Sequence, residues 1–125
     1  MIIQCGTDII EVERVKDAIE NMQEKFLNKV YTENEISYCN SKNKAKYQHY
    51  AARFAAKEAI FKAVSSRLND KYELIWTDVE IINDENGKPF VNILKESLKS
   101  KVDSIDISLS HIKEYAIANC IVVFK

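Results

Sequence analysis

The chain has 125 residues, of which 46% are hydrophobic and 30% are charged, and its formal net charge is −1 at pH 7. This length fits one domain that can bury a core without disulfides or metal ions, and the composition is typical of a soluble globular protein. The longest apolar run, residues 117–124, is far shorter than the roughly 20 residues that a membrane span needs, and no N-terminal signal peptide is expected.

The first half of the chain is predicted to contain a short strand followed by helices. Its apolar residues recur every three or four positions, which is the spacing of the buried face of a helix. Thr32, followed three residues later by Glu35, forms a capping box that starts one of these helices. The expected elements are a strand over residues 2–9 and helices over about residues 11–23, 26–30, 33–38 and 46–68.

After residue 70 the hydrophobic pattern changes from a helical to an alternating period, which is typical of half-buried strands. Asn86-Gly87, followed shortly by Pro89, is a strong signal for chain reversal and predicts a hairpin. The fold class is therefore predicted to be α+β, with helices early and an antiparallel sheet completed by the C-terminal half. The expected elements are strands over about residues 79–81, 90–93, 105–109 and 115–124, with a short helix near residues 95–101.

The long helix contains the segment RFAAKEAIFKA, residues 53–63, which places charged groups among small and aromatic ones. On a helical wheel Glu58 and Lys62 share one broad side with Phe54 and Phe61, so they interrupt an apolar stripe. Residues 39–67 hold seven basic residues and a single acid, whereas the rest of the chain is acidic. This asymmetry suggests an anionic ligand held at one place, and a solvated helix face is the alternative.

Several kinds of site have little support in this sequence. Neither His49 nor His111 lies beside a nucleophile motif, and no paired Cys/His spacing predicts a structural zinc site. The chain has only two glycines and no GxxxxGK[ST] loop, which excludes a P-loop. The cysteines form no CxxC pair and are expected to be reduced core residues of a cytosolic protein: Cys5, Cys39 and Cys120.

Asp8, at the end of the first strand, and Glu58, on the long helix, remain as candidate ligands of a metal ion. Two carboxylates are the usual protein share of a Mg²⁺ site, and water and substrate phosphates supply the other ligands. The alternative is an ion pair between Glu58 and Lys62, four residues apart, worth about 0.3–0.5 kcal/mol. The pattern alone favours that ion pair.

Two separated segments resemble the signatures of the 4′-phosphopantetheinyl transferase family, in its short bacterial holo-(acyl carrier protein) synthase type. GTDIIEVERV, residues 6–15, resembles the first signature, G-x-D-x-x-x-x-x-R-[VI], and residues 53–63 resemble the second, F-[AS]-x-K-E-A-x-x-K-A. GKP and SLSHIKEYA follow at residues 87–89 and 108–116 in the family's order. The resemblance implies the family's α+β fold, an antiparallel sheet with a long helix packed on it, in one domain of residues 1–125. It also implies a homotrimer with sites at the subunit interfaces.

The resemblance further implies a reaction. The 4′-phosphopantetheine arm of coenzyme A passes to a serine hydroxyl of apo acyl carrier protein, and adenosine 3′,5′-bisphosphate is released. The reaction serves fatty acid biosynthesis in the cytoplasm. Asp8 and Glu58 are expected to bind Mg²⁺ on the pyrophosphate, and Lys62 to meet a pyrophosphate oxygen, so these three are the catalytic candidates.

Other residues receive roles from the same resemblance. Arg53, His111 and Lys46 are candidates for binding the 3′-phosphate of coenzyme A, although His111 could instead be a turn-capping histidine. Arg14 is expected to dock the acidic carrier protein by charge complementarity. Its alternative is a surface ion pair with one of the glutamates beside it, Glu11 or Glu13. The general base stays open between Glu58 acting through a water, a water on the metal, and Lys57 if it is desolvated.

The chain departs from the family at the end of the long helix. Where the family usually continues KA-L-G-T-G, both glycines are absent, and Ser65 and Arg67 could supply side-chain donors in their place. The resemblance implies no nucleic acid or membrane partner. Two other classes of protein nevertheless stay open as alternatives. One is a non-catalytic subunit of an assembly. The other is a nucleotide- or RNA-binding module that stacks bases on Tyr47, Tyr50 and Phe54.

Overall fold

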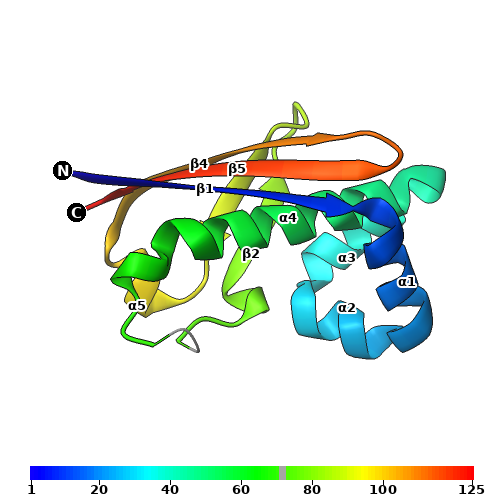
Figure 1. Cartoon of the computed structure of the whole chain (residues 1–125), viewed down its shortest axis with the longest axis horizontal. Helices are drawn as coiled ribbons and strands as arrows, with labels where there is room; N and C mark the ends of the chain where they lie inside the picture. Colours follow the sequence, from blue (N-terminus) through cyan, green and yellow to red (C-terminus); the bar gives the residue numbers. More distant parts are fainter. Residues whose placement is uncertain (71–72) are drawn as a thin grey trace.

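A three-stranded antiparallel sheet runs along one side of the molecule, and the long helix α4 (Lys46–Val64) packs along it (Figure 1). The strands are β1 (Ile2–Glu11), β4 (Val102–His111) and β5 (Tyr115–Phe124), with β5 in the centre. The computed structural model describes residues 1–70 and 73–125. This arrangement confirms the predicted α+β class, with a long helix packed on an antiparallel sheet.

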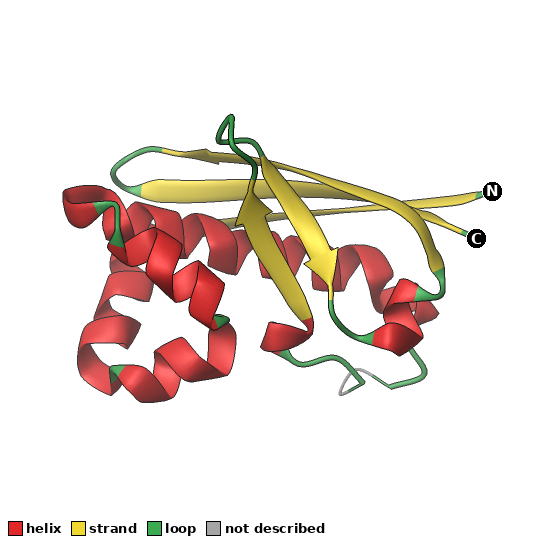
Figure 2. Ribbon diagram, turned by 180° about the vertical axis from the view of Figure 1, so that it is seen from behind, coloured by secondary structure: helices red, strands yellow, loops and turns green. Residues whose placement is uncertain are grey.

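The other elements surround α4. Figure 2 shows a separate two-stranded hairpin lying across the helix, while the shorter helices α1, α2 and α3 cluster near its N-terminal end. In the described part of the chain no helix has both the length and the apolar character to cross a membrane. The bounds are α1 (Val12–Met22), α2 (Glu24–Val30), α3 (Glu33–Asn40), β2 (Val79–Asn83), β3 (Pro89–Ile93) and α5 (Glu96–Lys99).

Each predicted helix and strand is present, with small shifts at the ends. The predicted capping box is confirmed, because the Thr32 hydroxyl accepts from the Glu35 N–H and the Glu35 carboxylate accepts from the Thr32 N–H. The long helix is shorter than predicted, since it ends at Val64 and continues as one 3₁₀ turn over Ser65–Arg67. The Ser65 hydroxyl donates to the Lys62 carbonyl at 3.0 Å, a local bond of the kind that competes with helix continuation.

The first strand lies unusually close to α4 at Gly6. A Cβ atom built on Gly6 would lie 2.0 Å from the carbonyl oxygen of Ala59 and 3.0 Å from the backbone nitrogen of Ala63. Strand and helix can pack this closely because residue 6 has no side chain and α4 presents alanines. Side chains alternate along a strand, so Asp8 points to the same face of the sheet as Gly6, toward α4.

A buried ion pair links α4 to the hairpin and the small helices. Lys57 and Glu35 have fully buried side chains, with 2.8 Å between Nζ and Oε1. The Lys57 ammonium also donates to the carbonyl oxygens of Val30 at 2.7 Å and Trp76 at 3.0 Å, and Glu35 accepts from the Ile81 N–H. Burial lowers the pKa of Lys57, and the Glu35 carboxylate opposes that shift. Every donor of this ammonium group is therefore used inside the core.

The cysteine prediction is correct for two thiols and wrong for the third. Cys39 and Cys120 are buried, and burial raises the pKa of each thiol to about 12. Cys5 is exposed, because it precedes Gly6 on β1 and so points to the opposite face of the sheet. All three thiols are free.

We expect the Gly6→Ala substitution to destabilise the fold, because the new methyl group would overlap the Ala59 carbonyl and push β1 away from α4. Overpacking of this kind costs about 1–3 kcal/mol, and the severity of the overlap predicts the upper end of that range. The measurement is the urea midpoint of unfolding, at constant m-value.

Gly87→Asn is the matched control for this substitution. Gly87 has a φ of +83° and no atom within 4 Å of its built Cβ, and asparagine tolerates that backbone conformation better than most residues. The decrease in the free energy of unfolding should be well under half as large for Gly87→Asn as for Gly6→Ala. Equal losses in the two variants would contradict a special packing constraint at Gly6.

Candidate functional site

Asp8 and Lys62 meet where β1 passes over the second half of α4. The Lys62 ammonium donates to Oδ1 of Asp8 at 3.2 Å and to the carbonyl oxygen of Thr7 at 3.0 Å. The side chain of Asp8 is 18% exposed and that of Lys62 is 54% exposed, so both charged groups are open to a ligand from solvent. The alternative pair between Glu58 and Lys62 is not formed among the described residues, since Lys62 pairs with Asp8.

Glu58 lies one turn before Lys62 on α4 and is half-buried. Burial raises the pKa of Glu58, the nearby Asp8 carboxylate raises it further, and Lys62 acts in the opposite direction. Two carboxylates and one ammonium group therefore lie near one another. Such a pair of carboxylates gains stability from an added cation, because each carboxylate disfavours ionisation of the other.

These two carboxylates fit the ligand preference of Mg²⁺. They are hard oxygen donors, and Mg²⁺ sites commonly use one or two carboxylates together with water and substrate phosphates. The described residues contain no cluster of three or more His, Cys, Asp or Glu side chains that could enclose a metal ion. The donor set thus suits an open Mg²⁺ site that is completed by a phosphate ligand and does not suit a closed structural site.

A second polar cluster surrounds Arg53, at a cavity of about 160 Å³ that His111 and Asn83 also line. Arg53 is only 1% exposed, and its guanidinium carbon lies 4.3 Å from the centre of the Tyr38 ring. One guanidinium nitrogen, Nη2, donates to the side-chain oxygen of Asn83, whereas Nε has no hydrogen-bond partner among the described residues. The positive charge of Arg53, which lines this cavity together with His111, suits an anionic ligand.

His49 belongs to the same cavity, although the sequence analysis did not assign it to a site. The His49 and His111 rings lie 5.1 Å apart, and Nδ1 of His111 is 2.9 Å from the side-chain oxygen of Gln48. Burial lowers the pKa of His49 to about 4, and the charges of His111 and Arg53 add to the effect. His49 is therefore neutral at pH 7. Its position one helical turn before Arg53 was the signal that could have identified it.

The two clusters are separate within one chain. Arg53 and Lys62 are nine residues apart on α4, which corresponds to roughly 13 Å along the helix axis. Lys46 does not line the Arg53 cavity, and its ammonium lies 5.1 Å from the centre of the Tyr47 ring. The structure therefore brings Asp8, Glu58 and Lys62 together, joins Arg53 with His111 elsewhere, and leaves Lys46 outside both clusters.

The remaining candidates also have clear positions. Lys57 cannot accept a proton from a substrate, because its side chain is fully buried and hydrogen-bonded in the core. Arg14 is exposed on α1, and within the described residues it pairs with neither Glu11 nor Glu13. Lys57 is thus the least suited of the three open candidates for the general base, whereas Arg14 is open to a partner.

An apolar hollow of about 340 Å³ adjoins the Asp8 cluster and was not predicted from the sequence. Lys62 lines one side of it, with Phe61, Leu68 and Leu74 supplying the apolar walls. These residues come from the end of α4 and from the segment before β2, so no local motif marks them. A ligand held by Lys62 can place an adjoining apolar group in this hollow.

Relatives of known identity match the chain over almost its full length. Residues 4–120 match the family model described as the 4′-phosphopantetheinyl transferase superfamily. A holo-[acyl-carrier-protein] synthase of Ruminiclostridium cellulolyticum is 48% identical over 122 residues, which cover 94% of this chain and 89% of that protein. The synthase of Protochlamydia amoebophila is 43% identical over 121 residues and covers similar shares of both chains, 94% and 95%.

Solved structures agree with the sequence matches. The holo-[acyl-carrier-protein] synthase of Helicobacter pylori in complex with coenzyme A has a TM-score of 0.82 at 29% identity, covering 95% of this chain and 99% of that one. The Bacillus anthracis synthase, in complex with CoA (3′,5′-ADP), has a TM-score of 0.75 at 34% identity, covering 95% and 94%. With both signatures in place and the fold shared throughout, the chain belongs to the 4′-phosphopantetheinyl transferase superfamily.

Proposed function

We propose that this chain is a holo-(acyl carrier protein) synthase, acting through one phosphopantetheinyl transferase domain of residues 1–125. It transfers 4′-phosphopantetheine from coenzyme A to a serine hydroxyl of apo acyl carrier protein and so supports fatty acid biosynthesis. The observation that carries the proposal is the meeting of Asp8, Glu58 and Lys62 beside an apolar hollow. The extent of identity with named synthases supports it. A cytoplasmic location remains a prediction, in keeping with three free thiols.

In the proposed reaction the serine oxygen attacks the phosphorus that carries the pantetheine arm. The bond from that phosphorus to the bridging diphosphate oxygen breaks, and adenosine 3′,5′-bisphosphate leaves with the electron pair. Asp8 and Glu58 would hold Mg²⁺, which when bound neutralises charge on the diphosphate. Lys62 donates to a diphosphate oxygen, for which it is released from Asp8. Glu58, acting through a water, is the proposed acceptor of the serine proton.

The apolar hollow beside Lys62 is proposed to receive the pantetheine arm. Phosphate oxygens bound at Lys62 leave the arm next to Phe61, Leu68 and Leu74, whose side chains can cover its methyl groups. The Ser65 hydroxyl is part of the same hollow and can serve an amide of the arm. Because the Ser65 O–H donates to the Lys62 carbonyl, its oxygen is left to accept a hydrogen bond from an N–H of the arm.

The Arg53 cavity is proposed to bind the 3′-phosphate of coenzyme A. The unpartnered Nε of buried Arg53 supports this assignment, and His111 and His49 can add ring N–H donors. Because this cavity and the Asp8 cluster lie far apart along α4, we propose that each coenzyme A uses Asp8 of one subunit and Arg53 of a neighbour. Lys46 is not supported as a phosphate ligand within one chain, since it lies outside the cavity.

A homotrimer is proposed because one face of the three-stranded sheet is uncovered. On β5 the face toward α4 is buried, whereas the opposite face carries exposed apolar side chains. Ile9 is 62% exposed, Ile3 is 54% exposed and Ile121 is 48% exposed. A closed cyclic assembly would cover these sheets around a common axis.

A nucleic-acid-binding module has less support than the transferase. Tyr50 is buried, and its hydroxyl donates to the side-chain oxygen of Asn40. Phe54 is stacked between Phe26 and Trp76, at ring-centre distances of 6.2 and 4.9 Å. These rings are therefore engaged with protein and are not free to stack on bases. A non-catalytic subunit is also disfavoured, because Asp8, Glu58 and Lys62 lie near one another although both glycines are absent.

The metal assignment predicts the effect of Glu58→Gln. Mass spectrometry of apo acyl carrier protein incubated with coenzyme A, Mg²⁺ and this protein should show a gain of one phosphopantetheine. Asp8→Ala and Glu58→Gln should each lower the rate by at least about 100-fold, because a metal ligand contributes several kcal/mol to the transition state. Glu96→Gln, at an exposed position on α5, is the matched control and should keep full activity. Near-normal turnover of Glu58→Gln across Mg²⁺ concentrations would refute the assignment.

The docking role of Arg14 is supported by its exposure near the start of α1, where it forms no ion pair with another described residue. At the other end of α1 a hollow of about 350 Å³ is lined by apolar groups such as Met22 and Phe26 and by Lys25 and Lys29. An acidic, amphipathic partner surface would complement this region. Arg14→Glu should therefore raise KM for the carrier protein about tenfold and leave KM for coenzyme A nearly unchanged.

Kinetics at two salt concentrations measure this effect, because docking by exposed charges weakens as salt rises. Lys99→Glu, the same charge reversal on exposed α5, is the control and should change neither constant. Equal increases in both KM values for Arg14→Glu would mean that Arg14 shapes the transfer site itself.

The shared-site proposal predicts complementation between inactive chains. Light scattering should give about three times the mass of one chain. Glu58→Ala and His111→Ala are each expected to be inactive, yet trimers mixed from both should regain part of the activity, since some interfaces combine an intact Glu58 with an intact His111. A monodisperse, fully active monomer, or mixed trimers without activity, would rule out shared sites.

A further inference from the structure

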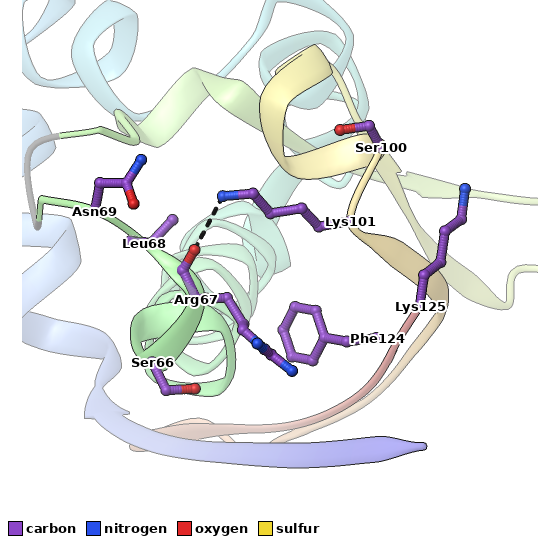
Figure 3. A pocket seen from close by; sticks show the side chains of 8 residues that line it. All are labelled: Ser66, Arg67, Leu68, Asn69, Ser100, Lys101, Phe124 and Lys125. Atoms are coloured by element: carbon purple, nitrogen blue, oxygen red, sulfur yellow. Dashed lines mark hydrogen bonds between the residues drawn. The ribbon is translucent and has the colours of Figure 1, made fainter.

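A cavity of about 530 Å³ lies beyond the end of α4, between three segments that are distant in the sequence (Figure 3). Leu68 separates it from the apolar hollow beside Lys62, because this residue lines both. The 3₁₀ turn after α4 and the residues next to it contribute Ser66, Arg67 and Asn69, and the end of β5 contributes Phe124. Lys101 follows α5, and Lys125 follows β5. Neither Lys62 nor Asp8 lines this cavity, and its volume suits a small molecule.

Three cationic side chains line the cavity. Arg67, Lys101 and Lys125 bring these charges, and among the described residues no Asp or Glu side chain is part of the lining. Among the described residues none of the three forms an ion pair, whereas the chain as a whole is slightly acidic. Glu73 is close in the chain, but its carboxylate accepts from the Asn69 N–H at 2.8 Å and does not line the cavity. Like charges gathered in a concave surface create a positive potential that attracts anions.

The cationic groups are also oriented by local contacts. The guanidinium carbon of Arg67 lies 5.4 Å from the centre of the Phe124 ring, a cation–π contact that sets the plane of its N–H donors (Figure 3). The Lys101 ammonium donates to the Arg67 carbonyl oxygen at 3.1 Å (Figure 3). That bond satisfies a carbonyl group of the 3₁₀ turn and is the one hydrogen bond that the Lys101 ammonium forms with a described residue, so two of its donors are unused.

We propose that this cavity is a second anion site, which binds a ligand through a diphosphate group. The three positive charges match the charge of a diphosphate better than that of a single carboxylate, and the planar fork of Arg67 suits bidentate contact with phosphate oxygens. The side chains of Ser66 and Asn69 supply neutral donors beside the cations. This site does not depend on the proposed transfer reaction.

Titration with inorganic pyrophosphate tests the proposal in the full-length Lys62→Ala protein, where the diphosphate contact of the transfer site is removed. In NMR spectra the Nε–Hε signal of Arg67 should shift saturably, with half-saturation below about 1 mM at 0.15 M NaCl. Calorimetry should show binding at least about tenfold weaker in Arg67→Gln and Lys125→Gln, each in the same background. Lys99→Gln, an equal charge change on α5 outside the cavity, should bind as tightly as the parent.

Two results would overturn the proposal. The first is a shift of the Arg67 signal that NaCl of equal ionic strength reproduces. The second is equal weakening by Lys99→Gln and Arg67→Gln, because it would mean that only net charge matters. ADP in a parallel titration separates the possible sources of the diphosphate. Equal affinities for ADP and pyrophosphate support recognition of the diphosphate alone, and tighter binding of ADP supports a nucleotide ligand. Neither measurement uses transfer activity, so failure here leaves the proposed function untouched.

Discussion

The close packing of Gly6 against the backbone of α4 is the constraint on which the site depends. Without a side chain at residue 6, β1 approaches until its backbone nearly touches the Ala59 carbonyl. The alternation of a strand then turns Asp8 toward the helix, and the helical period places Glu58 and Lys62 on the side that meets it. The distance between β1 and α4 therefore sets the distance between the carboxylates of Asp8 and Glu58.

Helix α4 buries two cations, and the structure uses them differently. Lys57 is enclosed by Glu35 and two carbonyl groups, so its charge serves to join α4 to α3 and to the segments before β2. Removing one member of such a pair leaves an uncompensated charge in the core, which typically costs about 3–5 kcal/mol. Arg53 is equally buried but incompletely paired, because its Nε has no partner in the described part of the chain. A buried donor that folding leaves unpaired can be paired by a ligand.

The separation of the two polar clusters and the uncovered sheet face have a common explanation in the proposed assembly. Within one chain the Asp8 cluster and the Arg53 cavity lie at different positions along α4. A single phosphate group cannot contact both of them. The same chain leaves isoleucines exposed on the outer face of the sheet. An assembly that covers this face would bring clusters from neighbouring chains together, so that burial of apolar surface and completion of the site would occur in one step.

The sequence by itself determined the helices and strands, because these depend on local patterns, and its resemblance to a known family supplied the candidate site residues. Alternation predicted the strands, the Thr32–Glu35 spacing predicted a cap, and two charged signatures pointed to Asp8 and Glu58. Only the tertiary structure decided which charges are buried. Lys57 looks like a solvated helix residue until its partner Glu35, 22 positions earlier, is folded against it. In the same way, the cations of the second cavity come from segments more than 20 residues apart, and packing alone brings them to one place.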